Sequence, residues 1–175
     1  MLCTSFMRSH KHSARVLLAV LAVISGILIA LPAWAAFTVS AAETTRMDFG
    51  TIAKPASGSQ YLDLSAANSA LTGTGSKLFG TASRGVYTLT KKGGGAGASM
   101  TLDISNVSTG SAALTFSNFV GIYQGITISS FPSSPQSLPA TAPGTPFYLG
   151  VRETVTSAIG VGALSPTFDL VITIN

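Results

Sequence analysis

The chain has 175 residues with a formal net charge of +4, from 10 basic and 6 acidic side chains, and only 9% of its residues are charged. Its single Cys, its single Trp and both His residues lie before residue 36. Residues 36–175 therefore have no means of forming disulfides, thiol nucleophiles, imidazole-based catalytic sites or metal sites with His or Cys ligands. Those residues hold seven basic and six acidic side chains, so they also lack the basic excess that nucleic-acid binding requires.

Residues 1–35 have the three parts of a secretion signal peptide. Three basic side chains come first, and an apolar run follows over residues 16–31. The sequence Ala33-Trp34-Ala35 then matches an A-x-A cleavage site, so we expect a signal helix that is removed between Ala35 and Ala36.

An uncleaved membrane anchor is the alternative for this segment, although a membrane span usually needs about 20 apolar residues. The sequence thus predicts a secreted protein that resides in the periplasm, on the outer surface or outside the cell. The membrane is a partner only through the signal peptide, before cleavage.

Apolar and polar residues alternate with a period of two over much of residues 37–175, which is typical of β-strands. Segments rich in Gly, Pro and Ser separate the alternating stretches. We predict about nine strands, at Phe37–Ala41, Met47–Ile52, Gln60–Leu64, Val86–Lys91, Ser99–Val107, Leu114–Tyr123, Ile126–Ser129, Phe147–Val151 and Phe168–Asn175.

Many short strands joined by polar turns indicate an all-β protein. The predicted fold is an antiparallel immunoglobulin-like β-sandwich, formed by residues 36–175 as a single domain after the signal helix. One segment, Ala66–Leu71, could form a single helical turn instead.

Two loops have an unusual composition. Gly93–Gly97 is rich in glycine, but the segment after it is predicted to be a strand. A phosphate-binding loop needs a helix at that place, so we predict a hairpin connection. The segment Ser130–Pro146 contains five prolines, which favours a long connection over the surface or between two sheets. A partner-binding loop is the alternative for this segment.

Paired carboxylates are the one catalytic device that the composition of residues 36–175 allows. Most of the six acidic residues alternate with apolar neighbours, so we expect them on outward faces or at strand ends, with no two of them in one cleft. We predict no catalytic residue, no enzyme activity, no cofactor and no metal. The six residues are Glu43, Asp48, Asp63, Asp103, Glu153 and Asp169.

Four short sequence patterns follow one another along the predicted strands. They are Met47-Asp48-Phe49-Gly50, Gly85-Val86-Tyr87, Leu149-Gly150-Val151 and the closing segment Thr167–Ile174. With them, most of residues 47–175 resembles the bacterial domain-of-unknown-function 4402 family of secreted all-β proteins. The resemblance implies a surface protein similar to fimbrial and spore-coat subunits, and it brings no catalytic residues with it.

The leading hypothesis is a non-catalytic structural or adhesive cell-surface protein, a pilin-like subunit that assembles by β-strand pairing. Low charge leaves strand edges poorly protected against association. Phe37, Val39 and Ala41 alternate in a segment suited to donation to a neighbouring copy, and pairing within its own sheet is the alternative. The expected partners are further copies of this chain or other surface subunits, and nucleic acid is not among them.

A soluble periplasmic or extracellular binding module for a glycan or a partner protein is the second hypothesis. Four tyrosines are its candidate stacking surfaces, provided that several of them point outward together. We expect at least half of them to be buried instead. They are Tyr61, Tyr87, Tyr123 and Tyr148.

Overall fold

The computed structural model describes residues 37–94 and 96–175, and every regular element in this part of the chain is a strand. All strand pairs are antiparallel, so the predicted all-β class is confirmed. The predicted signal segment and its cleavage residues Ala33, Ala35 and Ala36 lie outside the described residues.

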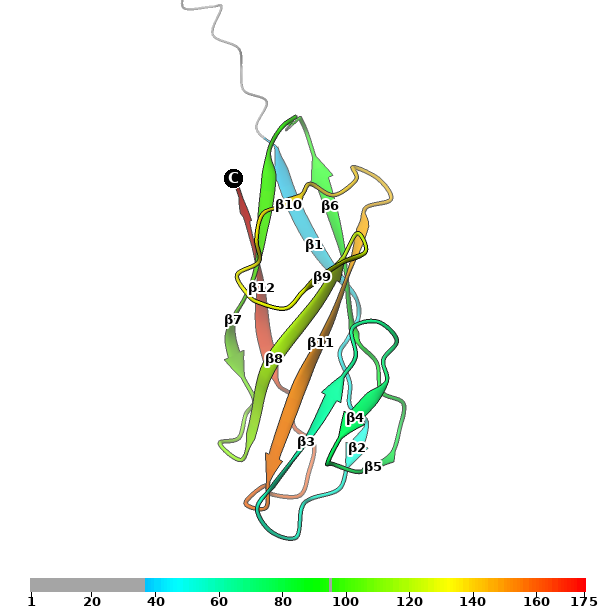
Figure 1. The fold of residues 1–175 in the computed structure, drawn as a ribbon, viewed down its shortest axis with the longest axis vertical. Helices are drawn as coiled ribbons and strands as arrows, with labels where there is room; N and C mark the ends of the chain where they lie inside the picture. Colours follow the sequence, from blue (N-terminus) through cyan, green and yellow to red (C-terminus); the bar gives the residue numbers. More distant parts are fainter. Residues whose placement is uncertain (1–36, 95) are drawn as a thin grey trace, which may run out of the picture. The chain divides into compact units, whose positions relative to one another are not determined.

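The described part of the chain contains twelve strands, which are labelled in Figure 1. They are β1 (Thr38–Thr45), β2 (Thr51–Ile52), β3 (Ser59–Leu64), β4 (Leu71–Gly73), β5 (Lys77–Phe79), β6 (Gly85–Lys92), β7 (Ser99–Ser108), β8 (Leu114–Tyr123), β9 (Ile126–Ile128), β10 (Gln136–Ser137), β11 (Thr145–Thr156) and β12 (Thr167–Ile174).

Strand β11 is the centre of the larger sheet, whose main order is β1-β6-β11-β3-β4. Along one edge it pairs with β6 through residues 145–149 and then with β3 through residues 152–156. Along the other edge it pairs with β8, which in turn pairs with β9. Because both edges of β11 are hydrogen-bonded, it joins all the other strands of this sheet.

A second sheet has the order β10-β7-β12, and β2 pairs with β5 in a separate short ribbon. The connection after β6 leads to β7 in the second sheet, so the hairpin predicted over Gly93–Gly97 is wrong. A hairpin there has no free edge to use, since β6 already pairs with β1 on one side and with β11 on the other. The proline-rich segment runs from β9 through β10 to β11, which confirms that it connects two sheets.

The predicted number of about nine strands is too low. The strands that were missed are β4, β5 and β10, which have only two or three residues each and are too short to show a period of two. The predicted strand at Met47–Ile52 is reduced to β2 and an isolated bridge between Asp48 and Ser83. Gly50 lies between them with φ of 73°, which interrupts the extended backbone. Residues 66–68 form a turn, and the segment Ala66–Leu71 has no helix.

The main hydrophobic core is formed by side chains from both sheets. Met100 and Leu102 of β7 cluster with Phe147 and Leu149 of β11, and all four are fully buried. The polar residues between them, such as Thr101 and Tyr148, are only half-buried. Burial of a side chain of this size contributes about 1.5–3 kcal/mol, so this alternation fixes which face of each sheet points inward.

Gly150 allows another segment of backbone to cross β11 at close range. A Cβ atom at this position would lie 2.1 Å from the Leu64 carbonyl oxygen and 2.6 Å from the Ala66 nitrogen. Both contacts are far below van der Waals distance and involve backbone, which has little freedom to move. Any other residue at position 150 must therefore displace the segment that follows β3.

We expect Gly150→Ala to lower the free energy of unfolding by about 1–3 kcal/mol, the range for an overpacked interior. Gly160→Ala is the matched control, because a Cβ atom at Gly160 meets no atom within 4 Å. Its effect should stay within about 0.5 kcal/mol. Urea unfolding of the two variants and the parent chain measures both values, and equal stability of the two variants would contradict the close approach at Gly150.

Candidate functional site

The predicted donor segment forms most of β1, which begins at Thr38 and extends to Thr45. It pairs with β6 of the same chain, from Thr38 opposite Lys92 to Thr45 opposite Val86. Phe37 lies directly before the strand, Val39 packs against the main core, and Ala41 is exposed. In the structure β1 thus pairs within its own chain, and exchange of this strand between copies stays a prediction.

A hollow of about 1310 Å³ opens beside the C-terminal half of β11. Its walls come from the segment between β1 and β3, from β5, from the ends of β8 and β11, and from the connection into β12. Apolar side chains dominate these walls, among them Phe49 and Phe116, whose rings stack with centroids 6.0 Å apart. Glu43, Asp48 and Glu153 line the same hollow, so the expectation that no two carboxylates share a cleft is wrong.

Glu153 is buried, with 7% of its surface exposed, and the prediction that it is solvated is therefore wrong for this residue. Its position follows from β11: Phe147, Leu149 and Val151 point inward, and two residues further along the strand Glu153 continues that inward row. Extending the alternation beyond Val151 finds Glu153 from the sequence alone. Acidic residues are seldom buried, so Glu153 is an exception to the usual preference.

The Glu153 carboxyl group lacks the partners that usually accompany a buried charge. Burial raises the pKa of Glu153 from its ordinary value near 4.5 to about 7, and the negative charge of Asp48 adds to the increase. Oε2 of Glu153 has no hydrogen-bond partner among the described residues. By contrast, Asp48 accepts a hydrogen bond from the Gly50 N–H at 2.7 Å and is exposed at the edge of the hollow.

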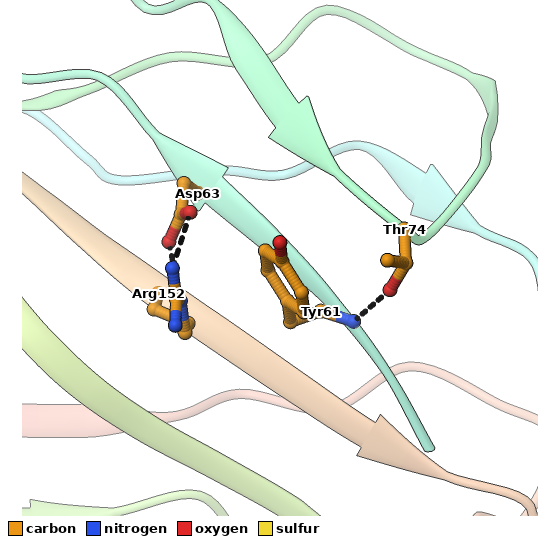
Figure 2. Close-up of polar contacts among 4 residues, drawn as sticks. All are labelled: Tyr61, Asp63, Thr74 and Arg152. Carbon is orange, nitrogen blue, oxygen red and sulfur yellow. Dashed lines mark hydrogen bonds and ion pairs between the residues drawn. The ribbon is translucent and has the colours of Figure 1, made fainter. Parts of the chain in front are cut away.

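On the opposite face of the larger sheet, charged and aromatic side chains form a second cluster (Figure 2). Arg152 of β11 donates two hydrogen bonds to Asp63 of β3, from Nε at 2.7 Å and from a terminal guanidinium nitrogen at 2.8 Å. The Arg152 guanidinium also lies over the Tyr61 ring, 4.3 Å from its centroid. This contact with Arg152 lowers the pKa of Asp63 below its ordinary value.

The four tyrosines do not form an open stacking surface. Tyr123 is fully buried and donates its hydroxyl hydrogen to the Ser137 carbonyl oxygen at 3.1 Å, and Tyr87 packs between Phe147 and Phe168. Arg84 covers the ring of Tyr148 at 3.8 Å from its centroid, as Arg152 covers that of Tyr61. Tyr123 alone of the four is buried, and Tyr61, Tyr87 and Tyr148 are half-buried, so the expectation that at least half are buried is wrong.

Residues 37–94 and 96–175 contain no group of three or more acidic, His or Cys side chains placed to hold a metal ion. The same residues include no helix with the length and apolar character required for a membrane crossing.

No protein-family model matches the chain, and searches of curated proteins and of solved structures also find no match. The resemblance to the domain-of-unknown-function 4402 family therefore stays a prediction.

We expect the free energy of unfolding of the parent chain to fall as the pH rises from about 4.5 to about 7, because over this range Glu153 has lost its proton in the unfolded state and keeps it in the folded state. The sign follows because the folded state holds this proton more tightly than the unfolded state, so it is the ionised form that burial destabilises. The full difference in pKa corresponds to up to about 3 kcal/mol. Glu153→Gln removes this dependence, so urea unfolding between pH 5 and 8 should give a flatter profile for the variant; parallel profiles would contradict the burial of this charge.

We expect Asp63→Asn to lower the free energy of unfolding by about 0.5–1 kcal/mol at low salt, a modest value because both side chains are about one third exposed. The loss should shrink in about 1 M salt, where charges are screened over a few ångströms. The same substitution in an Arg152→Gln background should have almost no effect. A full effect in that background would show that Asp63 acts through contacts other than Arg152.

Proposed function

We propose that this chain is a non-catalytic, secreted structural or adhesive cell-surface protein, a pilin-like subunit of immunoglobulin-like sandwich type that assembles by β-strand pairing. The periplasm, the outer surface or the extracellular space is its location. Further copies of the chain or other surface subunits are its partners.

The observation that carries this proposal is the position of β1 at the edge of the larger sheet (Figure 1). Seven of its eight residues are exposed, and Val39 alone is partly buried. Backbone hydrogen bonds to β6 therefore supply most of what holds the strand in place. Its outer edge pairs with no described strand, and Glu43 is the one charged residue that β1 carries against edge association.

Exchange of β1 between copies costs little at equilibrium. The strand leaves β6 of its own chain and pairs with β6 of a neighbour, so the same hydrogen bonds form in the new place. The small buried area of β1 keeps the barrier to detachment low. Each copy that donates its strand has its own β6 edge open to another donor, so the pairing can extend from copy to copy.

A non-catalytic role agrees with the composition, which leaves residues 36–175 without Cys or His. The predicted signal peptide and the resemblance to a family of secreted β-proteins support a surface location. Both come from the sequence, and they agree with an exposed strand that begins just after the expected cleavage point.

A soluble periplasmic or extracellular binding module is the second candidate function. The hollow beside β11 favours it, because a subunit that only pairs through its edges has no need for a buried carboxyl group. The outer face of the sheet gives less support to glycan stacking, since arginine side chains cover the rings of Tyr61 and Tyr148.

A reversible disulfide that ties β1 to β6 of the same chain tests strand exchange. Ser40 and Thr90 face each other in the β1–β6 register, so Ser40→Cys with Thr90→Cys places two thiols across the pair. The background carries Cys3→Ser, which leaves the two new thiols as the only ones in the chain. We expect the reduced protein to form oligomers at high concentration like the parent chain, and the oxidised protein to remain monomeric, by light scattering and electron microscopy.

Two outcomes would sink strand exchange. One is a parent chain that stays monomeric at every concentration tested. The other is a set of oligomers that form equally well from the oxidised and reduced proteins. Mass spectrometry after protease digestion confirms that the disulfide joins residues 40 and 90 of one chain.

A further inference from the structure

The hollow beside β11 combines an unpartnered buried carboxyl group with an apolar wall that remains open to solvent. We propose that this hollow binds a small primary ammonium ion with an apolar stem, and that the ammonium group pairs with the Glu153 carboxylate. The proposal goes beyond an assembly role and does not depend on it.

Charge complementarity identifies the head group. Oε2 of Glu153 is a buried acceptor with no donor among the described residues. Asp48 adds a second negative charge, which is close enough to raise the pKa of Glu153. Arg46 and Lys54 line the same hollow, but both are exposed and neither forms an ion pair with Glu153. An ammonium group with three donors satisfies Oε2 and neutralises the charge that burial destabilises.

The apolar walls identify the rest of the ligand. Leu78, Phe79, Val161 and Leu164 line the hollow with between 40% and 95% of their surfaces exposed. They are half of the large apolar side chains that are exposed in the described part of the chain. Such a concentration around one opening marks a binding site for an apolar group rather than scattered surface residues.

The scarcity of buried polar groups in the hollow argues against a neutral glycan. A sugar presents many hydroxyl groups and needs several placed donors and acceptors, whereas Glu153 is the one buried polar side chain among the lining residues. Gln136, the other described residue with an unpartnered buried oxygen, does not line the hollow. A single charged contact at the base of apolar walls fits a ligand with one cationic end and one apolar end.

Binding of such a cation should strengthen as Glu153 loses its proton. The other charged groups at the hollow are Glu43, Asp48, Arg46 and Lys54. Tyr87 also lines the hollow, but burial first and the charge of Glu43 second raise its pKa to about 12, so it stays neutral. The pKa of Glu153, about 7, places the change in its charge between pH 6 and pH 8.

The test uses three six-carbon probes with different ends, n-hexylammonium, 1-hexanol and hexanoate, and measures binding to the full chain by calorimetry. We expect n-hexylammonium to bind best and hexanoate worst. Affinity for n-hexylammonium should rise about tenfold from pH 6 to pH 8, because the ionised fraction of Glu153 rises by about that factor. Each methylene added to or removed from the stem should change the affinity by up to about threefold to fourfold.

Two variants and one control locate the site. Glu153→Gln should weaken n-hexylammonium binding at pH 8 by about tenfold and remove its pH dependence, while 1-hexanol binding stays unchanged. Phe79→Ser should weaken both probes about equally, since Phe79 is exposed and contributes only to the apolar wall. Asp103→Asn is the control, because it removes a carboxylate that lies outside the hollow.

The proposal is overturned if hexanoate binds as well as n-hexylammonium, if no probe binds, or if Glu153→Gln leaves n-hexylammonium binding unchanged. Should Glu153→Gln fail to fold, the probe series and its pH dependence on the parent chain still decide. Equal binding of the three probes at all pH values would then count against the carboxylate. Failure here leaves strand exchange intact, because the disulfide between residues 40 and 90 is measured without any probe.

Discussion

The pairing of β11 along both of its edges is the constraint on which the rest of this structure depends. Through β6, β3 and β8 it holds every other strand of the larger sheet, and its inward side chains meet those of β7 across the core. A strand held in this way cannot rotate to expose one unfavourable residue. Glu153 therefore occupies an inward position because Phe147, Leu149 and Val151 before it require one, despite what burial costs a carboxylate.

Long alternating segments were predictable from the sequence because their pattern reports burial directly. Residues 100–104 and 168–172 each have an inward and an outward face, as expected, and both lie in strands. The short strands β4, β5 and β10 were not predictable, since two or three residues are too few to show a period of two. The connection after β6 was predicted wrongly because the edge that a hairpin needs is taken by β11, a strand that is distant in the sequence.

The candidate site was predictable in part. The segment that became β1 was recognised by its alternation, but its place at the edge of the sheet is a property of the topology. Glu153 was within reach of the alternation rule, whereas the hollow around it was not. Its walls come from six separate parts of the chain between residues 43 and 168, and only the fold shows that these parts meet.

The proposed strand exchange and the proposed ammonium binding share one segment of the chain. Glu43 in β1, with Met47 and Asp48 just after it, lines the hollow that contains Glu153. Exchange requires this segment to change its backbone conformation as β1 leaves its own sheet. A cation bound at Glu153 interacts with the segment in its present position, so it stabilises the unexchanged chain by the difference in its affinity for the two states. Because such coupling is reciprocal, a chain that has donated β1 must hold the cation less tightly by the same factor. Ligand binding and assembly would then oppose each other through residues 43–48.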